Sequence, residues 1–529
     1  MRLASPPPDV RLVNAFERPY DNAVAAARTC YAAKGIVLPE QVAGEDVSDP
    51  AERAQVRARR DEIAESIYRA GHHTVFQHAH FQFAIDRISR HALWAFFHAH
   101  PFYNSEQVSQ RYVRVRPGSV LVPRLDGAAQ SLYEQTVERQ QRAYRELTEL
   151  LVPVAGEIFF RIFPARARQP ERWKREIRRK AQEAARYVLP VATWARLYHT
   201  ISGITLLRYH RACRQPDVPW EVAEIVSRMA AAVRDLDPDF GRLLEEPLPL
   251  EDSPDARALA GVGGAWNAAR ARAFREEFDA GLAGRVSRLV GWAPDAEALT
   301  AQAVREVLGA PRHVLSDDEA IAMLADPARN TLLGEALNLT TLSPLSRAMH
   351  HAHYTFRKKL SHTADSQDQR HRMTPGSRPI LVGHLGDEPD VIAPELIVRH
   401  EPASRLFDET MARTWEALDG LRRLGVDAQT AAYLLPNAVA VRFTESGDFS
   451  AIRHKHAMRL CYNAQEEIWR ASLDEALQIA DVHPRLGRWL LPPCAIRERR
   501  GVRPFCPEGP RYCGVPVWKM PAREYVREL

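Results

Sequence analysis

The chain has no apolar run of about 18 residues, the length that a membrane-spanning helix needs. Its first residues, MRLASPPPDVRLVN, lack the apolar core of a secretion signal. Six cysteines in 529 residues are too few and too scattered for a disulfide framework. These absences argue against a membrane protein and against a disulfide-stapled secreted protein, and we expect a protein of the reducing cytoplasm.

Neither sign of charge dominates, because 72 basic residues face 67 acidic ones. No basic stripe with interleaved aromatic residues is visible, so a nucleic-acid partner is not expected. The hydrophobic fraction of 45% and the charged fraction of 26% are typical of a globular protein. A chain of 529 residues is too long for one small core, and we expect two or three domains.

Helical periodicity dominates the sequence. Apolar residues recur at a spacing of three to four in five segments, which we expect to be amphipathic helices: 52–69, 130–151, 171–187, 218–236 and 464–480. Strict alternation is confined to the shorter segments 80–88 and 353–360, which predict strands. The fold class expected from this pattern is α+β.

Two sequence landmarks occur twice. HAHFQF at 78–83 returns as HAHYTF at 351–356, and ARYVLP at 185–190 returns as AAYLLP at 431–436. We therefore expect two copies of one domain, copy one at 1–245 and copy two at 257–482, joined by a Pro- and acid-rich linker at 246–256 and followed by a Pro/Cys-rich tail at 483–529. The two landmarks of copy two, at 351 and 431, are closer together in the sequence than those of copy one, at 78 and 185. This difference predicts a deletion in copy two between its strand and its long helices.

Copy one carries a cluster of groups suited to an anion, in the segment SEQVSQRYV at 105–113. Ser109 offers a hydroxyl, Arg111 a two-pronged guanidinium and Gln107 an amide that could read the edge of a base. Arg186 stands further on, directly before YVLP. The alternative for each of these residues is structural: a capped turn with a solvated arginine, and a surface ion pair.

Copy two carries a compact cationic triplet, Arg370-His371-Arg372, within QDQRHRMTPGS at 367–377. Such a triplet suits a phosphate or an electron-rich ring system, although a solvated basic run is the alternative. Arg459 follows in HKHAMRLCYNAQEEIW at 454–469, on a segment expected to be helical.

Together these pieces resemble the flavin-dependent thymidylate synthase family. That family combines an Arg-His-Arg triplet with a serine in S-x-R-Y after seven intervening residues. Around these lie an upstream ISR, a downstream AR-x-x-L-P and a helix of the form R-x-x-x-x-A-Q-x-E-I. Here AARTCY at 26–31 matches the start of the family and ISR lies at 88–90. The resemblance spans about 20–240 and 335–480, with the signature divided between the two copies.

In copy one both arginines of the triplet are absent. The triplet positions hold His98, Ala99 and His100 when counted forward from ISR, or Ala99, His100 and Pro101 when counted back from the serine. The helix arginine falls at Cys213.

Copy two shows the opposite losses. Its triplet and helix arginine are intact, but the serine falls at Ile380 and the arginine of AR-x-x-L-P falls at Ala432. Each copy therefore keeps what the other has lost, which favours one composite site over a decayed, inactive homologue.

The resemblance implies a site built between subunits, with nucleotide contacts from one and flavin contacts from another. Carried over residue by residue, the substrate-binding set is Gln107, Ser109, Arg111 and Arg186 from copy one, with Gln367 and Arg459 from copy two. The cofactor-binding set is Arg370, His371, Arg372, His78, His351 and His454. For His78 and His351 a half-buried strand histidine is the alternative.

The implied reaction is reductive methylation of dUMP to dTMP, with FAD as cofactor and NADPH and methylenetetrahydrofolate as co-substrates. Because the chain already contains two copies, we expect a homodimer in place of the family's homotetramer. No catalytic nucleophile is assigned, because no base is evident beside Ser109. The alternatives are a catalytically inactive or repurposed nucleotide-, flavin- or RNA-binding homologue, and a partner subunit of a single-copy enzyme. Asp448 stands where the family has asparagine, which leaves the uracil nucleotide open.

The tail contains Cys494, Cys506 and Cys513, with His483 upstream. Three thiols and an imidazole could hold zinc, but the spacing contains no C-x-x-C pair, and ordinary buried thiols are favoured. Cys30, Cys213 and Cys461 are expected in the core.

Overall fold

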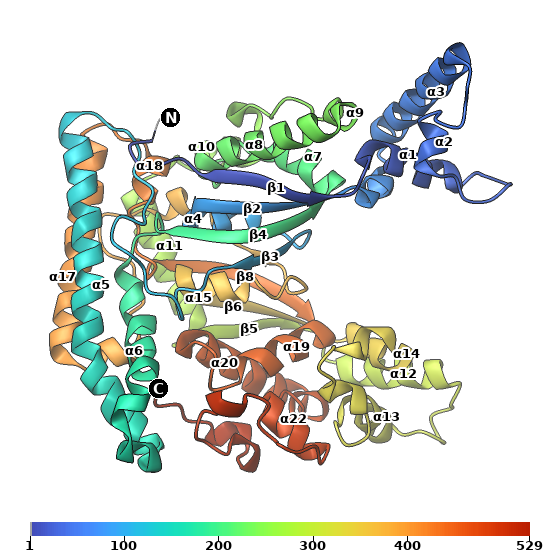
Figure 1. Cartoon of the computed structure of the whole chain (residues 1–529). Coiled ribbons are helices and arrows are strands. Elements are labelled where there is room, and N and C mark those ends of the chain that lie inside the picture. The colour runs from blue at the N-terminus through green and yellow to red at the C-terminus, as the bar shows by residue number, and fades with distance from the viewer. Residues whose placement is uncertain (1–2) are drawn as a thin grey trace.

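The computed structural model describes residues 3–529 and contains two four-stranded antiparallel sheets of the same topology, one above the other in Figure 1. The first has the order β1-β2-β4-β3 and the second the order β5-β6-β8-β7. The strands are β1 (Asp9–Ala15), β2 (His80–Ser89), β3 (Asn104–Gln107), β4 (Trp194–Ser202), β5 (Ser287–Trp292), β6 (His353–Ser361), β7 (Gly376–Ser377) and β8 (Ala440–Asp448). The predicted α+β fold with two copies is confirmed.

The strand register shows which residues are equivalent. His80 pairs with Ser202 at the end of the first sheet, as His353 pairs with Asp448 at the end of the second. β2 is one residue longer than β6, and its register shifts at Arg87, which has a left-handed φ of 60°. A β-bulge of this kind adds one residue to a strand, and the pairing with the neighbouring strand continues on either side of it.

All five predicted helices are present: α3 (Pro50–Arg69), α5 (Gly127–Ile162), α6 (Pro170–Ala185), α8 (Glu221–Leu236) and α20 (Glu466–Val482). In copy two, α17 (Glu401–Arg423) and the short α18 (Ala428–Ala432) take the chain positions of α5 and α6. α5 has 36 residues against 23 in α17, and α6 has 16 against 5 in α18. The sequence predicted a deletion between the strand and the long helices of copy two. The structure shows instead that the helices themselves are shorter.

The two copies meet through reciprocal backbone hydrogen bonds. Val191 N–H donates to the carbonyl of Leu435, and Asn437 N–H donates to the carbonyl of Leu189, each over 2.8 Å. These residues occupy matching positions in the repeated ARYVLP and AAYLLP segments. The contact is therefore a local pseudo-twofold axis, and it creates two equivalent interfaces.

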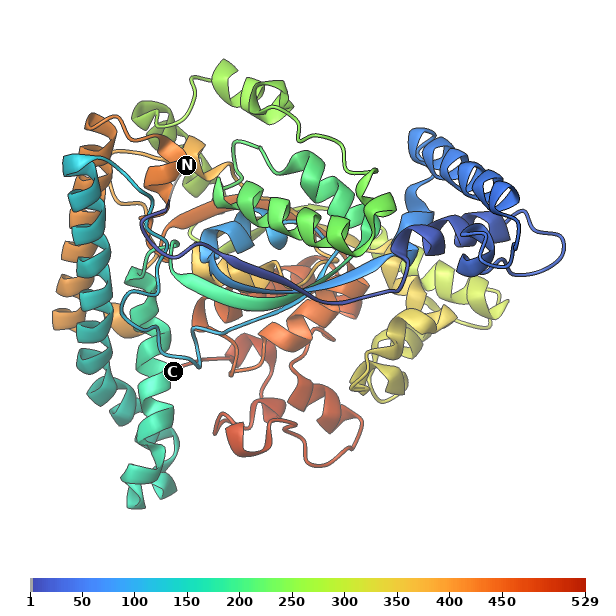
Figure 2. The same ribbon diagram turned by 45° about the horizontal axis from the view of Figure 1, so that its top comes forward.

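A shared hydrophobic core surrounds this axis. One cluster of buried residues joins Trp94 and Tyr133 of copy one to Leu360 and Tyr433 of copy two, and includes Tyr525 of the tail. α5, α6 and α17 lie together at one side of both sheets (Figures 1 and 2). Since separation of the copies would expose this core, they form one folding unit. Within residues 3–529, no helix is both long and apolar enough to span a membrane.

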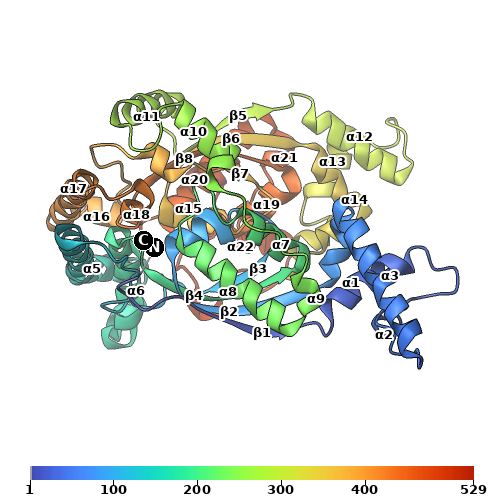
Figure 3. The ribbon, with the colours of Figure 1, turned by 90° about the horizontal axis from the view of Figure 1, so that it is seen from above.

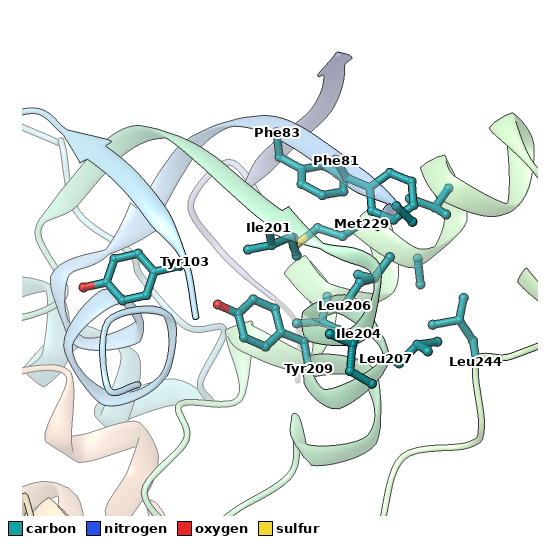
Figure 4. Packing of buried hydrophobic residues seen from close by; sticks show 14 of the residues in the cluster. Phe81, Phe83, Tyr103, Ile201, Ile204, Leu206, Leu207, Tyr209, Met229 and Leu244 are labelled. Atoms are coloured by element: carbon teal, nitrogen blue, oxygen red, sulfur yellow. The ribbon is translucent and has the colours of Figure 1, made fainter. Parts of the chain in front are cut away.

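The core of copy one is apolar behind its sheet. Phe81 and Phe83 of β2 pack near Ile201 of β4, with Met229 of α8 between the sheet and the helices (Figure 4). Figure 3 shows α8 lying across the strands of this sheet. Full burial of such side chains is worth about 1.5–3 kcal/mol each.

The core of copy two instead contains a buried ion cluster. Lys358 Nζ lies 2.5 Å from Asp368, 2.7 Å from Glu445 and 2.8 Å from Glu475, and Lys455 Nζ lies 2.7 Å from Glu445. Burial alone would lower the pKa of Lys358, but the three carboxylates raise it well above its usual value. By repeat position, Ile85, Tyr209 and Met229 of copy one stand where Lys358, Lys455 and Glu475 stand in copy two. The ion cluster is thus found in the copy that keeps the cationic triplet, and Asp368 ends α15 (His362–Asp368) two residues before it.

Two carboxylates make reciprocal contacts beside the pseudo-twofold axis. Glu467 accepts from Tyr187 and from Ser361 Oγ, each over 2.6 Å. Its counterpart Glu221 accepts from Tyr433 over 3.2 Å and from Ser89. Burial raises the pKa of Glu221 to about 7.

We predict that Lys358→Met lowers the free energy of unfolding by about 3–5 kcal/mol, because it leaves three buried carboxylates with Lys455 as their one lysine partner. Urea denaturation followed by tryptophan fluorescence measures this. Ile85→Met, at the matching position of copy one, is the control and should cost less than about 1.5 kcal/mol. Equal effects of the two substitutions would contradict a stabilising role for the ion cluster.

We also predict a pH dependence from Glu221. Because its pKa rises from 4.5 to about 7 on folding, the folded state binds the extra proton between these values, and stability falls as pH rises through this window. The loss approaches about 3 kcal/mol. Glu221→Gln should remove this part of the pH dependence in denaturation curves, whereas Glu224→Gln, exposed on the same helix, should not.

Candidate functional site

Arg186 and Gln367, predicted to act together from different copies, share one partner in the structure. Arg186 lies directly after α6 and is 5% exposed. Its Nη2 donates to Gln465 Oε1 over 2.7 Å, and the same oxygen accepts from the amide of Gln367. Gln465 in turn donates to the hydroxyl of Tyr187. One glutamine of copy two thus aligns polar groups from both copies.

Arg111 is also held across the copies. Its Nε donates to Glu183 of α6 over 2.7 Å, and its Nη2 donates to the carbonyl of Asn463 of copy two over 2.6 Å. Burial alone would raise the pKa of Glu183, but Arg111 and neighbouring cations lower it to about 2. Glu183 is therefore charged at neutral and mildly acidic pH.

Arg459 ends α19 (Phe449–Arg459) and touches the triplet. Its Nε donates to His371 Nε2 over 2.8 Å, and its Nη2 donates to the carbonyl of Gln367 over 3.0 Å. Burial lowers the pKa of Arg459 to about 10, with Arg111 contributing. Burial and Arg459 lower the pKa of His371 well below its usual value, so His371 is neutral and accepts. His454 also lies here, with its ring 6.2 Å from that of His371.

The two arginines of the triplet cross to the segment of copy one that lacks its own triplet. Arg370 donates to the carbonyl of Ser105 over 2.7 Å, and Arg372 donates to the carbonyl of Pro101 over 3.2 Å. The Arg372 guanidinium lies 5.3 Å from the centre of the Tyr103 ring. Copy two thus supplies its triplet at the place where copy one has lost it.

A cavity of about 600 Å³ lies beside this contact and is lined by both copies. His78, Phe102 and Tyr103 of copy one line it together with Arg372 of copy two. A second cavity of about 270 Å³ shares Tyr103 and Arg372 with the first and adds Arg370. Tyr103 Oη is buried and has no hydrogen-bond partner among residues 3–529. The lining combines aromatic faces, cations and an unused hydroxyl, which suits a flat anionic ligand.

Further cations stand near Arg111. Arg527 of the tail is 8% exposed, and its Nη1 has no hydrogen-bond partner within the described chain. It lines a small cavity with Lys180, Glu183 and Gln465, where the C-terminus lies beside α6 (Figures 1 and 2). Burial, together with Arg527, lowers the pKa of Lys180 to about 8.

Ser109 and Gln107 lie on the copy-one side of the site. Ser109 Oγ accepts from Arg111 N–H over 3.2 Å and lines a cavity of about 310 Å³ rich in arginine. Gln107 ends β3, and its Oε1 accepts from Arg90 over 3.0 Å. Gln107 is thus engaged within copy one and is not drawn to the copy-two residues.

His351 is separated from the other predicted residues. It is exposed on copy two and does not line the cavity that its counterpart His78 shares with Arg372. Asp448 caps α19 by accepting from Ala451 N–H over 2.8 Å, and it also lies 2.9 Å from His350.

The expectation that three cysteines lie in the core holds only in part, since Cys461 is half-buried. Cys213 is buried as predicted, but Cys30 is exposed. His483 is buried against the hydroxyl of Tyr354, 2.9 Å away, and is not part of a zinc site with the tail cysteines. Across residues 3–529, no three His, Cys, Asp or Glu side chains are arranged to hold a single metal ion.

The second interface made by the pseudo-twofold axis is filled with apolar side chains. Trp94, Val382 and Ala432 pack there in the shared core, with Trp220 beside them. Val382 and Ala432 stand at the repeat positions of Arg111 and Arg186. The chain therefore has one polar and one apolar interface between its copies.

Sequence reasoning missed Glu183, Lys180 and Arg527, and it did not assign Gln465 to the site. The sequence could have pointed to Glu183 and Gln465 as site residues. Glu183 lies three residues before Arg186, and Gln465 belongs to the A-Q-x-E-I motif. Arg527 carried none, because only the folding of the tail brings it to α6.

Comparisons with known proteins agree with the duplicated fold. The family model for thymidylate synthase complementing protein matches residues 11–239 and 288–485. A flavin-dependent thymidylate synthase of Clostridium tetani is 25% identical over 237 residues, covering 44% of this chain and 84% of the relative. That of Geobacter sulfurreducens is 27% identical over 224 residues, covering 42% and 90%. Each relative thus corresponds in length to about one copy.

A third relative, the flavin-dependent thymidylate synthase of Mycobacterium sp. (strain JLS), is 32% identical over 139 residues, covering 25% of this chain and 50% of the relative. Among solved structures, the UMP/dUMP methylase PolB from Streptomyces cacaoi bound with 5-Br dUMP is 20% identical, with a TM-score of 0.29 and coverage of 46% of this chain and 96% of that chain. The family model, matched twice along the chain, carries the assignment. The chain belongs to the thymidylate synthase complementing protein family, as a tandem of two copies.

Proposed function

We propose that the chain is a flavin-dependent methyltransferase that converts dUMP to dTMP at one composite site formed between its two copies. The supporting observation is the excess of cations at the polar interface. Arg111, Arg186, Arg459, Lys180 and Arg527 influence one another's charge. Glu183 binds Arg111, and Glu466 lines the same cavity as Arg527. Buried cations of this number are costly without counter-charge, and a nucleotide phosphate supplies it.

In this proposal Arg111, Arg186 and Arg459 bind the phosphate, because guanidinium groups match its oxygens with paired hydrogen bonds. Gln367 and Gln107 offer amide donors and acceptors to the uracil edge. Ser109 acts as a hydrogen-bond donor and not as a nucleophile, since its contact in the structure is the Arg111 N–H and no base adjoins it.

FAD fits the groove beside Tyr103. His78, Arg370 and Arg372 line that groove, and the unpartnered Tyr103 hydroxyl is free to bind a polar ring atom. When bound, FAD supplies the hydride chemistry, with NADPH as electron source and methylenetetrahydrofolate as carbon donor. Arg370 and Arg372 stabilise negative charge on the ring system, and neutral His371 keeps Arg459 in place.

The copies contact each other through a buried core, so the composite site closes within one chain. A homodimer of such chains in the cytoplasm would reproduce the four domains of a homotetramer. One nucleotide site per chain is then expected, because the second interface is apolar.

We predict that the purified protein is yellow or takes up FAD, and that dUMP changes its visible spectrum with a stoichiometry of about one per chain. Arg111→Ala and Arg459→Ala should each weaken dUMP binding about 10- to 100-fold, the loss of one charge-assisted contact. Arg178→Ala is the matched control, since Arg178 lies exposed on α6 and pairs with Glu149. Because the site closes within one chain, a mixture of the two variants should restore nothing.

A colourless protein that FAD does not reconstitute would contradict the proposal. Binding of dUMP and FAD without formation of dTMP would favour the inactive homologue instead. Recovery of binding in the mixture would show that the sites form between chains.

Arg527 yields a separate prediction. Arg527→Ala should weaken binding of dUMP about tenfold but leave deoxyuridine, which lacks the phosphate, unchanged. Arg523→Ala is the control, because Arg523 is an exposed tail residue paired with Asp481. Isothermal titration with both ligands distinguishes loss of a phosphate contact from general loosening of the tail, which would weaken both.

A further inference from the structure

We propose that Cys461, Cys494, Cys506 and Cys513 are the ligands of a tetrathiolate metal centre that fastens the tail to copy two. The four thiols come from separate segments: the loop after α19, the helix α22 (Pro493–Arg499), and two positions in the irregular chain that follows. None of the four is in a disulfide, and all are half-buried. They are four of the six cysteines in the chain.

Direct contacts bring the loop of Cys461 to the tail. Asn463 Nδ2 donates to the carbonyl of Arg511 over 2.8 Å, two residues before Cys513. The rings of Tyr462 and Tyr525 are 6.2 Å apart. The segment after α19 and the segment around Cys513 are therefore in contact.

Trp518 contacts residues next to two of the remaining cysteines. Its ring lies 5.7 Å from Phe505 and 6.0 Å from Tyr512, the neighbours of Cys506 and Cys513. The turn that contains Trp518 packs against α22, which carries Cys494. Cys494 and Cys513 also pack against the same hydrophobic core.

The electrostatics agree with this convergence. Cys494 lies within electrostatic range of the Cys461, Cys513 and Cys506 thiols. Cys461 in turn lies within electrostatic range of Cys513 and Cys506. Four thiols close enough to influence one another suit a soft metal, which holds such groups as thiolates.

Two centres share this ligand chemistry, a single zinc ion and an iron–sulfur cluster. Within the described chain, no three such side chains are arranged to hold one ion, which disfavours a single zinc ion. A cluster attaches each cysteine to a different iron atom and needs less convergence. The position is informative in either case, because Asn463 and Gln465, which hold Arg111 and Arg186, follow Cys461 within four residues.

Metal analysis of the full chain, purified without oxygen, tests the proposal. We expect either about one zinc per chain or about four iron and four sulfide per chain, the second with a brown colour that persists after removal of flavin. Cys506→Ser and Cys513→Ser should each lose the metal, whereas Cys30→Ser, at an exposed cysteine outside the group, should keep it. Circular dichroism shows whether each variant remains folded.

The wild-type chain alone can overturn the proposal, whatever the variants do. After anaerobic purification it is offered zinc, and in a second sample iron with sulfide, and the bound metal is measured after gel filtration. Stoichiometric zinc or stoichiometric iron and sulfide supports the centre and identifies it. Metal below about a tenth of the chain concentration in both samples, with the four thiols reacting as freely as Cys30, overturns it.

Discussion

The reciprocal backbone hydrogen bonds between the repeated segments fix how the two copies face each other, and the rest of the site depends on that relation. Val191 with Leu435 and Asn437 with Leu189 make the same contact twice, once from each copy. Such a contact necessarily produces two interfaces of the same backbone geometry. What distinguishes them is only which side chains each copy contributes.

The divided signature has a physical explanation in this pair of interfaces. At one of them Arg111, Arg186 and Arg459 meet Glu183, Gln465 and His371. At the other, Val382 and Ala432 replace two of these arginines, and tryptophan side chains fill the space. An unused polar pocket in the centre of the molecule leaves buried charges without partners, which is expensive. Apolar side chains at one interface remove that cost, while the other interface keeps its polar side chains.

The ion cluster of copy two follows the same division. Lys358, Asp368 and Glu445 lie under the loop that carries the triplet, whereas the matching region of copy one is apolar or aromatic. A loop that holds two guanidinium groups and a neutral imidazole in fixed positions needs a rigid support. A loop that has lost those groups needs only packing. The difference between the two cores thus follows which copy carries the intact triplet.

Much of the fold could be predicted from the sequence, because periodicity and the repeated landmarks are local features. The strands at HAHFQF and HAHYTF and all five helices were identified in this way. Arg111, Arg186, Gln367 and Arg459 could be grouped, because each lies in a motif. The separation of His351 from the cavity could not, since its sequence context equals that of His78 and only the pseudo-twofold arrangement distinguishes them. The length of α5 was also underestimated, because packing against α6 and α17 carries the helix past Pro153.

The tail shows the limit of sequence reasoning most clearly and gives the site its final constraint. It lies mostly beyond the segment matched by the family model, yet Tyr525 is buried in the shared core and Arg527 reaches Glu183 and Lys180. A segment without a long helix or strand has little to hold it in place, and ordering it costs about 1–2 kcal/mol per residue. Its position therefore depends on contacts with both copies, among them the ion pair of Glu528 with Arg161 of α5 and the burial of Tyr525 in the shared core. The group of Cys461, Cys494, Cys506 and Cys513 stands where such a contact is needed, between the loop that holds Arg111 and the residues that lead to Arg527. Fastening at that point would order the loop that holds Arg111 and the residues that lead to Arg527 at once.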